Sequence, residues 1–264
     1  MDLAFVIILG GLWGSFANVC IYRLPQEKGV VSGRSYCPKC NKKIVWYDNI
    51  PIVSFFLLGF KCRRCKKPIS PQYIIVEIIN IISFALIYYF FGISLTTIFL
   101  MMLGLSFLII FFIDLKHFII PNELTYSMMI VGFIKSFDPN LSYLFPNYVD
   151  SLVGGLFGYG VIWSIILFYK QVRNKEGMGL GDAKLLAVIG FWFGWISIPF
   201  VLFFSSVFAL IWVTPSLIKK SKNFTSQIPF GPYLILAAIL FFVSKDKLLD
   251  LSLIHISEPT RPLS

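Results

Sequence analysis

Charged residues are scarce in this chain of 264 residues. Asp, Glu, Lys and Arg make up 14% of the sequence, whereas 57% of the residues are hydrophobic and the mean hydropathy is +0.80. A soluble domain carries about a quarter charged residues, so the composition argues against a water-soluble globular fold. The hydrophobicity also excludes disorder, and five cysteines over this length exclude a disulfide-rich secreted scaffold. The composition indicates an all-α polytopic membrane protein.

Long apolar runs recur along the sequence, and about 20 apolar residues are needed to cross the hydrocarbon core. The first run has no basic region before it and no small-residue cleavage site, so we expect a mature span and not a signal peptide. We expect residues 244–264 to form a tail, whose end, Leu253–Ser264, resembles a read-through or adaptor-derived extension. About eight transmembrane helices are predicted, at Leu3–Tyr22, Tyr73–Phe91, Leu95–Ile113, Phe118–Phe137, Tyr148–Tyr169, Ala183–Trp195, Ile198–Ile218 and Ile228–Val243.

Acidic residues are scarcer than basic ones: 13 Asp and Glu stand against 23 Lys and Arg, a formal net charge of +10. In membrane proteins an excess of basic residues marks the cytoplasmic loops. With eight crossings and the N-terminus outside, 19 of the 23 basic residues fall on the inner side. The largest inner loop, residues 23–72, carries 11 basic and 2 acidic residues. This excess favours anionic lipid headgroups as its partner and argues against nucleic acid.

Four of the five cysteines form two CxxC pairs in this loop, Cys37 with Cys40 and Cys62 with Cys65. Two thiolates at that spacing can bind one ion, and two such pairs complete the tetrahedral sulfur site that Zn²⁺ favours. A redox pair would need a single CxxC at a strand–helix junction, and a reducing cytoplasm disfavours a disulfide. We therefore expect a structural zinc that stabilises a small cytoplasmic insert. The fifth cysteine, Cys20, is expected to be a small buried side chain.

Two aspartates stand at the predicted inner membrane face: Asp114 ends the third apolar segment and Asp182 opens the sixth. An ionisable group at that depth costs about 2.5–3.5 kcal/mol on insertion scales unless it is paired or hydrated. A structural interpretation is open, in which Asp182 caps the following helix and Asp114 pairs with Lys116 or His117. The functional interpretation is an aspartic dyad, with one carboxylate ionised and the other holding the proton.

These residues belong to an ordered set of motifs by which the chain, from about Gly10 to Tyr233, resembles the type IV prepilin peptidases. Two positions depart from that pattern: Asn122 stands where an acidic residue is common, and Gln72 where Arg is frequent. The glycine motif around Asp182 is the GxGD signature shared with presenilin-type intramembrane proteases. The matching segments are Gly14–Pro25, Arg34–Tyr36, Trp46–Pro51, Ile69–Tyr73 leading to Glu77, Asp114 followed by Pro121–Thr125, Gly179–Lys184 and Pro229–Tyr233.

The resemblance implies an aspartic endopeptidase of the bacterial inner membrane with its active site at the cytoplasmic face. Such an enzyme removes the basic leader of prepilins or pseudopilins after a glycine and methylates the new N-terminus with S-adenosylmethionine. Asp114 and Asp182 carry over as the catalytic pair, and the four paired cysteines as the zinc site. Gly179, Gly181 and Lys184 carry over as a substrate loop, where glycine allows a close backbone approach. The implied domains are a first helix over 1–22, a zinc loop over 23–72 and a peptidase core over 73–243.

The methyl-donor site is not marked by a glycine-rich GxGxxG fingerprint. Glu77 is the acidic group at the membrane side of the zinc loop and is the candidate for cofactor binding. Its structural alternative is an interfacial residue satisfied by a nearby lysine. Two other functions stay open: a peptidase without methyltransferase activity, and a transporter that relays protons or cations through Asp114 and Asp182.

Overall fold

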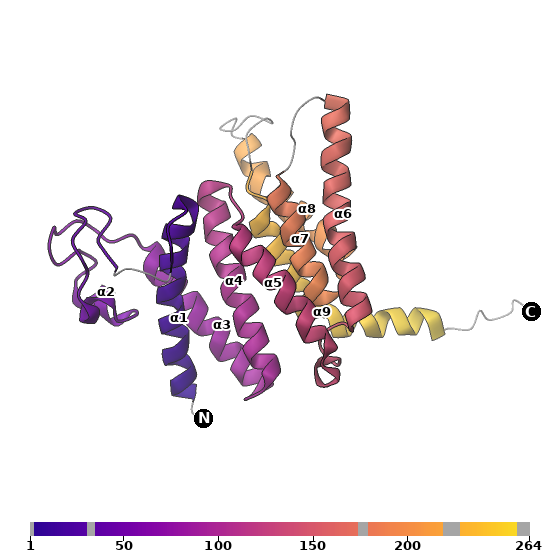
Figure 1. Ribbon diagram of the computed structural model, residues 1–264, viewed down its shortest axis with the longest axis horizontal. Coiled ribbons are helices and arrows are strands. Elements are labelled where there is room, and N and C mark those ends of the chain that lie inside the picture. The colour runs from indigo at the N-terminus through magenta and orange to yellow at the C-terminus, as the bar shows by residue number, and fades with distance from the viewer. Residues whose placement is uncertain (1–2, 31–34, 174–178, 219–227, 258–264) are drawn as a thin grey trace, which may run out of the picture. The chain divides into compact units, whose positions relative to one another are not determined.

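The computed structural model describes residues 3–30, 35–173, 179–218 and 228–257 (Figure 1). Within these ranges the regular structure is helical, apart from two isolated β-bridges. The chain divides into two compact units, Met1–Leu124 and Thr125–Ser264. The α-helices are α1 (Leu3–Arg23), α2 (Val53–Leu57), α3 (Gln72–Phe91), α4 (Leu95–His117), α5 (Asn122–Ile134), α6 (Tyr148–Arg173), α7 (Leu180–Phe193), α8 (Ser197–Ile218) and α9 (Gly231–Ser257).

Each of the eight predicted apolar segments corresponds to one of these helices. Five are long and apolar enough to cross a membrane: Leu3–Gln26, Gln72–Phe91, Leu95–His117, Tyr148–Val172 and Ser197–Thr214.

In the remaining three helices the apolar part is shorter than the prediction of eight spans requires. α5 and α7 have 13 and 14 residues, roughly 20 Å of helix against a hydrocarbon core of about 30 Å. The apolar part of α9 is Gly231–Lys245, and the helix runs on to Ser257, beyond the predicted end at Val243. Of the predicted tail, residues 258–264 lie outside the described part of the chain.

In the N-terminal unit, α1 packs closely against α3 because two glycines face the contact. A Cβ at Gly10 would lie 3.0 Å from Cα of Ile81, and one at Gly14 would lie 2.9 Å from Cα of Glu77. This is the small-residue spacing that lets helix backbones approach in membranes. Asn18 also links α1 to α3, since its Nδ2 donates to the carbonyl of Tyr73 at 2.9 Å.

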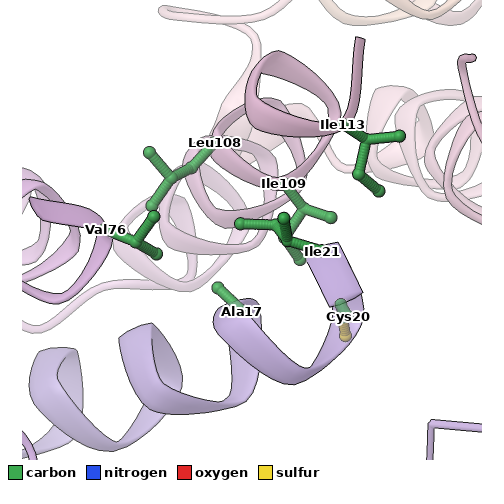
Figure 2. Packing of buried hydrophobic residues seen from close by; sticks show 7 residues of the cluster. All are labelled: Ala17, Cys20, Ile21, Val76, Leu108, Ile109 and Ile113. Atoms are coloured by element: carbon green, nitrogen blue, oxygen red, sulfur yellow. The ribbon is translucent and has the colours of Figure 1, made fainter. Parts of the chain in front are cut away.

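A buried core joins α1, α3 and α4 (Figure 2). The side chains of α4 lie against those of α1, with Val76 of α3 at their edge. Cys20 belongs to this core and is buried, as predicted. The core consists of Ala17, Cys20, Ile21, Val76, Leu108, Ile109 and Ile113.

Local signals set the ends of these helices. Gly92 ends α3 with a positive φ of 59°, which glycine adopts without strain. Ser94 then starts α4, because its hydroxyl accepts from the amide of Thr97. α4 ends at His117, three residues beyond Asp114, and Phe118 follows in the left-handed conformation.

In the C-terminal unit, α6 and α7 are in backbone contact at glycines. A Cβ on Gly154 would lie 2.5 Å from the carbonyl oxygen of Gly190, and one on Gly158 would lie 2.7 Å from that of Leu186. Trp192 of α7 is fully buried and donates from Nε1 to the carbonyl of Met128 at 2.8 Å. α8 and α9 also pack against each other in this unit.

The glycine contact predicts that Gly154→Ala destabilises the C-terminal unit. The added methyl cannot fit beside the Gly190 carbonyl, and overpacking of this kind costs about 1–3 kcal/mol of unfolding free energy. Gly160→Ala in the same helix is the control, because a Cβ there meets nothing within 4 Å. Thermal unfolding in detergent, followed by tryptophan fluorescence, should give a lower midpoint for Gly154→Ala alone. An unchanged midpoint would contradict the described packing.

Candidate functional sites

The two CxxC pairs fold into turns of the same construction. After each pair an amide donates back to the first cysteine, from Asn41 to the Cys37 carbonyl at 2.8 Å and from Lys66 to the Cys62 carbonyl at 3.0 Å. Asn41 and Lys66 have positive φ values of 54° and 56°. An isolated β-bridge closes each turn, Tyr36 with Lys43 and Lys61 with Pro68.

The four thiol groups of these turns converge on one point. All four sulfur atoms lie within 4.8 Å of one another, and Sγ of Cys37 is 3.9 Å from Sγ of Cys65. A tetrahedral zinc with Zn–S bonds near 2.3 Å places its sulfurs roughly 3.8 Å apart. The sequence prediction that Cys37, Cys40, Cys62 and Cys65 form one cluster is therefore confirmed, and the cluster has the donor set and spacing for zinc.

Nearby backbone groups make one of these thiols easier to deprotonate, and a metal ligand must be a thiolate. The backbone N–H groups of Cys65 and Arg64 lower the pKa of the Cys62 thiol to about 7, because they stabilise its thiolate. Burial raises the pKa of Cys37 instead, so its thiol needs a metal ion to displace the proton.

A charged clamp joins the second cysteine turn to the middle of the loop. The Arg63 guanidinium makes a bidentate contact with the carboxylate of Asp48, at 2.8 Å from Nε to Oδ2 and 2.7 Å from Nη2 to Oδ1. Arg63 also lies 5.5 Å from the centroid of the Tyr47 ring. This pairing fixes the Trp46–Asn49 turn against the cysteine turns.

A cavity of about 660 Å³ lies within the N-terminal unit, beneath the cysteine turns. Its size is that of a small-molecule site. The wall combines aromatic and basic groups with two carboxylates, that of Asp48, which is paired with Arg63, and a second one buried on α3. Residues that line it include Asn18, Tyr22, Tyr36, Ile52, Glu77, Lys116 and His117.

The carboxylate on α3 belongs to Glu77, which is 8% exposed. Its Oε2 accepts from the amide of Ile52 at 2.8 Å, and no ion pair joins it to a basic residue in the described part of the chain. The partner is therefore a backbone amide and not the lysine of the structural alternative. A carboxylate that is buried and faces a cavity favours a cationic ligand.

Asp114 lies in the last turn of α4 in the N-terminal unit and is buried, at 4% exposed. Its backbone carbonyl accepts from the amide of Phe118 at 3.0 Å, which closes the helix end. Of the partners considered from sequence, Lys116 donates to Oε1 of Gln72, at the start of α3. The next residue, His117, faces the cavity.

Asp182 lies in the first turn of α7, in the C-terminal unit, and is half-buried. Gly179 is the N-cap, with its carbonyl accepting from the Asp182 amide at 3.2 Å, and Gly181 is the second residue of the helix. The helix dipole favours a carboxylate at this end. Lys184 is half-buried and lies 5.2 Å from the centroid of the Tyr126 ring. Asp114 and Asp182 thus belong to different units, and their pairing stays a prediction.

Sequence reasoning missed several polar side chains that the fold buries. Lys135 follows α5, is 2% exposed, and places Nζ 4.0 Å from the centroid of the Phe145 ring. Asn80 donates from Nδ2 to the Gly10 carbonyl at 2.7 Å, and Asn18 lines the cavity. All three stand in predicted apolar segments, where polar residues are rare. This rarity is the signal in the sequence that could have marked them as structurally important.

Comparison with known proteins shows to which family the chain belongs. Residues 8–91 match the bacterial Peptidase A24 N-terminal domain, and residues 99–214 match the Type IV leader peptidase family. A relative from Pseudomonas aeruginosa is 33% identical over 93% of this chain and 92% of its own. The chain belongs to the type IV leader peptidase family. This membership gives the transporter alternative no support.

Relatives in this family carry a two-part name. Those from Pseudomonas aeruginosa, Vibrio cholerae and Neisseria gonorrhoeae are each called prepilin leader peptidase/N-methyltransferase. The Vibrio cholerae protein is 34% identical over 92% of this chain and 98% of its own, and the Neisseria gonorrhoeae protein 31% identical over 90% and 89%. No solved structure matches this chain.

The cysteine cluster predicts one zinc ion per chain. Replacing Cys37 and Cys62 together by Ser removes one ligand from each turn, so bound zinc should fall to near zero and trypsin should cut the basic loop faster. Metal analysis of the purified protein with limited proteolysis measures both effects. Cys20→Ser is the matched control, because Cys20 lies in the helical core. Unchanged zinc content in the double variant would refute the site.

Proposed function

We propose that this protein is an endopeptidase of the bacterial inner membrane that removes the basic leader of prepilins or pseudopilins after a glycine. Family membership over nearly the whole chain carries this proposal, together with the names of the relatives. The apolar helices support a multi-pass placement, for which we retain eight crossings with the N-terminus outside. On this topology the active site opens at the cytoplasmic face.

Asp114 and Asp182 are proposed as the catalytic pair. One carboxylate, ionised, removes a proton from the attacking water, and the other, protonated, polarises the scissile carbonyl and then protonates the leaving nitrogen. The burial of Asp114 in the last turn of α4 supports its place in such a pair, because a reacting carboxyl group acts best where bulk water is excluded. Gly179, Gly181 and Lys184 are proposed to form the substrate loop. The N-cap position of Gly179 supports this role, because a substrate strand can approach a backbone without side chains.

The dyad predicts that Asp114→Asn and Asp182→Asn each lower the cleavage rate by at least about 10³-fold, since each removes an ionisable group that the mechanism needs. The measurement is cleavage of a membrane-embedded prepilin by the purified variants. Asp150→Asn is the control, because Asp150 contacts Asn147 at the start of α6, away from the proposed loop in sequence. Substantial cleavage by either active-site variant would overturn the assignment.

We further propose that the protein methylates the new N-terminus with S-adenosylmethionine bound in the cavity of the N-terminal unit. Its cationic sulfonium and ammonium groups suit the buried Glu77 carboxylate. The edge-on pair of Tyr22 and Tyr36, with ring centroids 6.0 Å apart, offers an aromatic surface for the adenine. Zinc held by the four cysteines would stabilise the loop that roofs this cavity, and its closed shell of thiolates leaves no position for chemistry.

Glu77→Gln tests the methyl-donor proposal. The amide keeps the size of the side chain but removes its charge, so binding of S-adenosylmethionine should weaken by about tenfold or more. Labelled methyl transfer to the cleaved prepilin should fall accordingly, while leader cleavage in the same reaction reports on the peptidase. Unchanged affinity, measured by calorimetry, would contradict the role of Glu77. A wild-type protein that cleaves but transfers no label would leave the peptidase-only alternative.

A further inference from the structure

The middle of the zinc loop, residues 46–60, has a composition unlike the rest of that loop. From Asn49 to Phe60 it has no charged residue, whereas Asp48 and Lys61 bracket it. An apolar stretch of about 10–14 residues is too short to span a membrane but fits a re-entrant or interfacial segment. α2 forms the centre of this stretch.

The same segment lies deep along α1. Tyr36, in the first cysteine turn, contacts Tyr22 near the cytoplasmic end of α1, with ring centroids 6.0 Å apart. Pro51, in contrast, lies at the level of Gly11, where a Cβ would be 3.2 Å from Cβ of Pro51. In the view of Figure 1, α2 lies level with the middle of α1 and not beyond its end.

The level of Gly11 can be placed against the membrane boundary. α3 has 20 residues, roughly 30 Å, which equals the thickness of the hydrocarbon core, so on the proposed membrane placement its ends mark the two faces of that core. Asn18 is bonded to Tyr73 at the start of α3 and therefore stands at the inner face. Gly11 lies about two turns further along α1 than Asn18, roughly 10 Å below that face. Pro51 thus reaches into the inner leaflet.

The outward face of the segment is apolar. Leu57 is 80% exposed, and most of the other exposed side chains are also large and hydrophobic, with Asn49 as a polar exception. Ser54 points inward instead and donates to the carbonyl of Tyr47 at 2.9 Å. A face of this kind suits acyl chains and is unfavourable in water. The exposed hydrophobic side chains are Trp46, Tyr47, Ile50, Val53, Phe56, Leu57 and Phe60.

From Pro51 to Phe60 the backbone meets the requirement for burial in lipid, where amides without partners are costly. Pro51 has no amide hydrogen, and the Ile52 amide, at a positive φ of 62°, donates to Glu77 of α3. The buried carboxylate thus takes the amide at the start of α2. Backbone carbonyls within the segment accept from the amides of Val53, Ser54, Phe55, Phe56, Leu58, Gly59 and Phe60.

From these observations we propose that residues 46–60 form a re-entrant segment that enters the inner leaflet and contacts lipid acyl chains, held by the Ile52–Glu77 hydrogen bond. This rests on the proposed membrane placement, not on either catalytic activity. Lipid is the occupant that the charges favour, because the flanking Lys61, Arg64 and Lys67 complement anionic headgroups just outside the core. Glu77 is in this respect a positioning residue.

Depth measurement by electron paramagnetic resonance tests the proposal. A nitroxide is attached to p-acetylphenylalanine at position 57, which spares the native cysteines, in full-length protein in nanodiscs containing phosphatidylglycerol. Oxygen, which concentrates in lipid, and a water-soluble nickel chelate then compete to relax the label. Position 82 is the membrane control, on the lipid-exposed side of α3, and position 39 is the aqueous control in the first cysteine turn.

The label at Leu57 should match the one at Ile82, accessible to oxygen and protected from the nickel chelate. Accessibility to nickel equal to that at Lys39 would overturn the proposal. Protection that arises only when prepilin is added would overturn it too, and would assign the face to the substrate. None of these readouts requires cleavage or methyl transfer, so failure of either proposed activity leaves the result interpretable.

Two variants of Glu77 test the tether. Glu77→Gln retains an oxygen that can accept from Ile52, so the label at position 57 should stay protected. Glu77→Leu has no acceptor and leaves the Ile52 amide without a partner in lipid, so exposure to nickel should increase. A label that remains equally protected in both variants would overturn the tether. Increased exposure in Glu77→Gln would overturn it as well, because a charge and not an acceptor would then be required.

Discussion

Gly10 and Gly14 bring the backbone of α1 against that of α3, and the organisation of the N-terminal unit depends on this approach. The zinc loop begins where α1 ends and finishes where α3 begins, so the helix contact closes the loop at its base. The cysteine cluster closes it a second time near its outer part. Two closures let a short segment with little core of its own hold a defined cavity. A larger side chain at Gly14 would displace Glu77 along with the helix that carries it.

The Glu77 carboxylate and the Ile52 amide would each be costly at membrane depth without a hydrogen-bond partner. A carboxylate at membrane depth needs hydrogen-bond donors, and an irregular turn at that depth needs an acceptor for its amide. The Ile52 amide donates to the Glu77 carboxylate, so a single hydrogen bond satisfies both groups. The carboxylate has a second oxygen and lines the cavity, where a cationic methyl donor would complete its neutralisation. The proposed structural and binding roles of Glu77 are therefore compatible. Binding of the cationic methyl donor needs the charge of the carboxylate, whereas the structural role needs only an oxygen that accepts from Ile52.

The helices, the cysteine cluster and the helix ends that carry both aspartates could be predicted from the sequence, because each depends on local pattern. Apolar runs mark helices, and CxxC spacing marks a turn. The length of α5 could not be predicted in this way, since the apolar run of residues 118–137 continues through a turn at Lys135. The depth of residues 46–60 depends on contacts of Pro51 and Ile52 with Gly11 and Glu77, which are distant in sequence. The burial of Lys135 could not be predicted either, because its aromatic partners Phe145 and Trp192 follow later in the chain.

The division of the chain into units does not follow the division between the two matched family models. The second model begins at residue 99 and includes Asp114, yet α4 packs on α1 and α3 through Leu108, Ile109 and Ile113. The same last turn of α4 carries Asp114 and, three residues on, His117 in the cavity wall. Residues with this spacing lie on neighbouring parts of one helix face. If Asp114 cleaves and the cavity holds the methyl donor, the new N-terminus forms within about one helical turn of that wall. The two activities then share a structural element, so neither can be assigned to a separable domain.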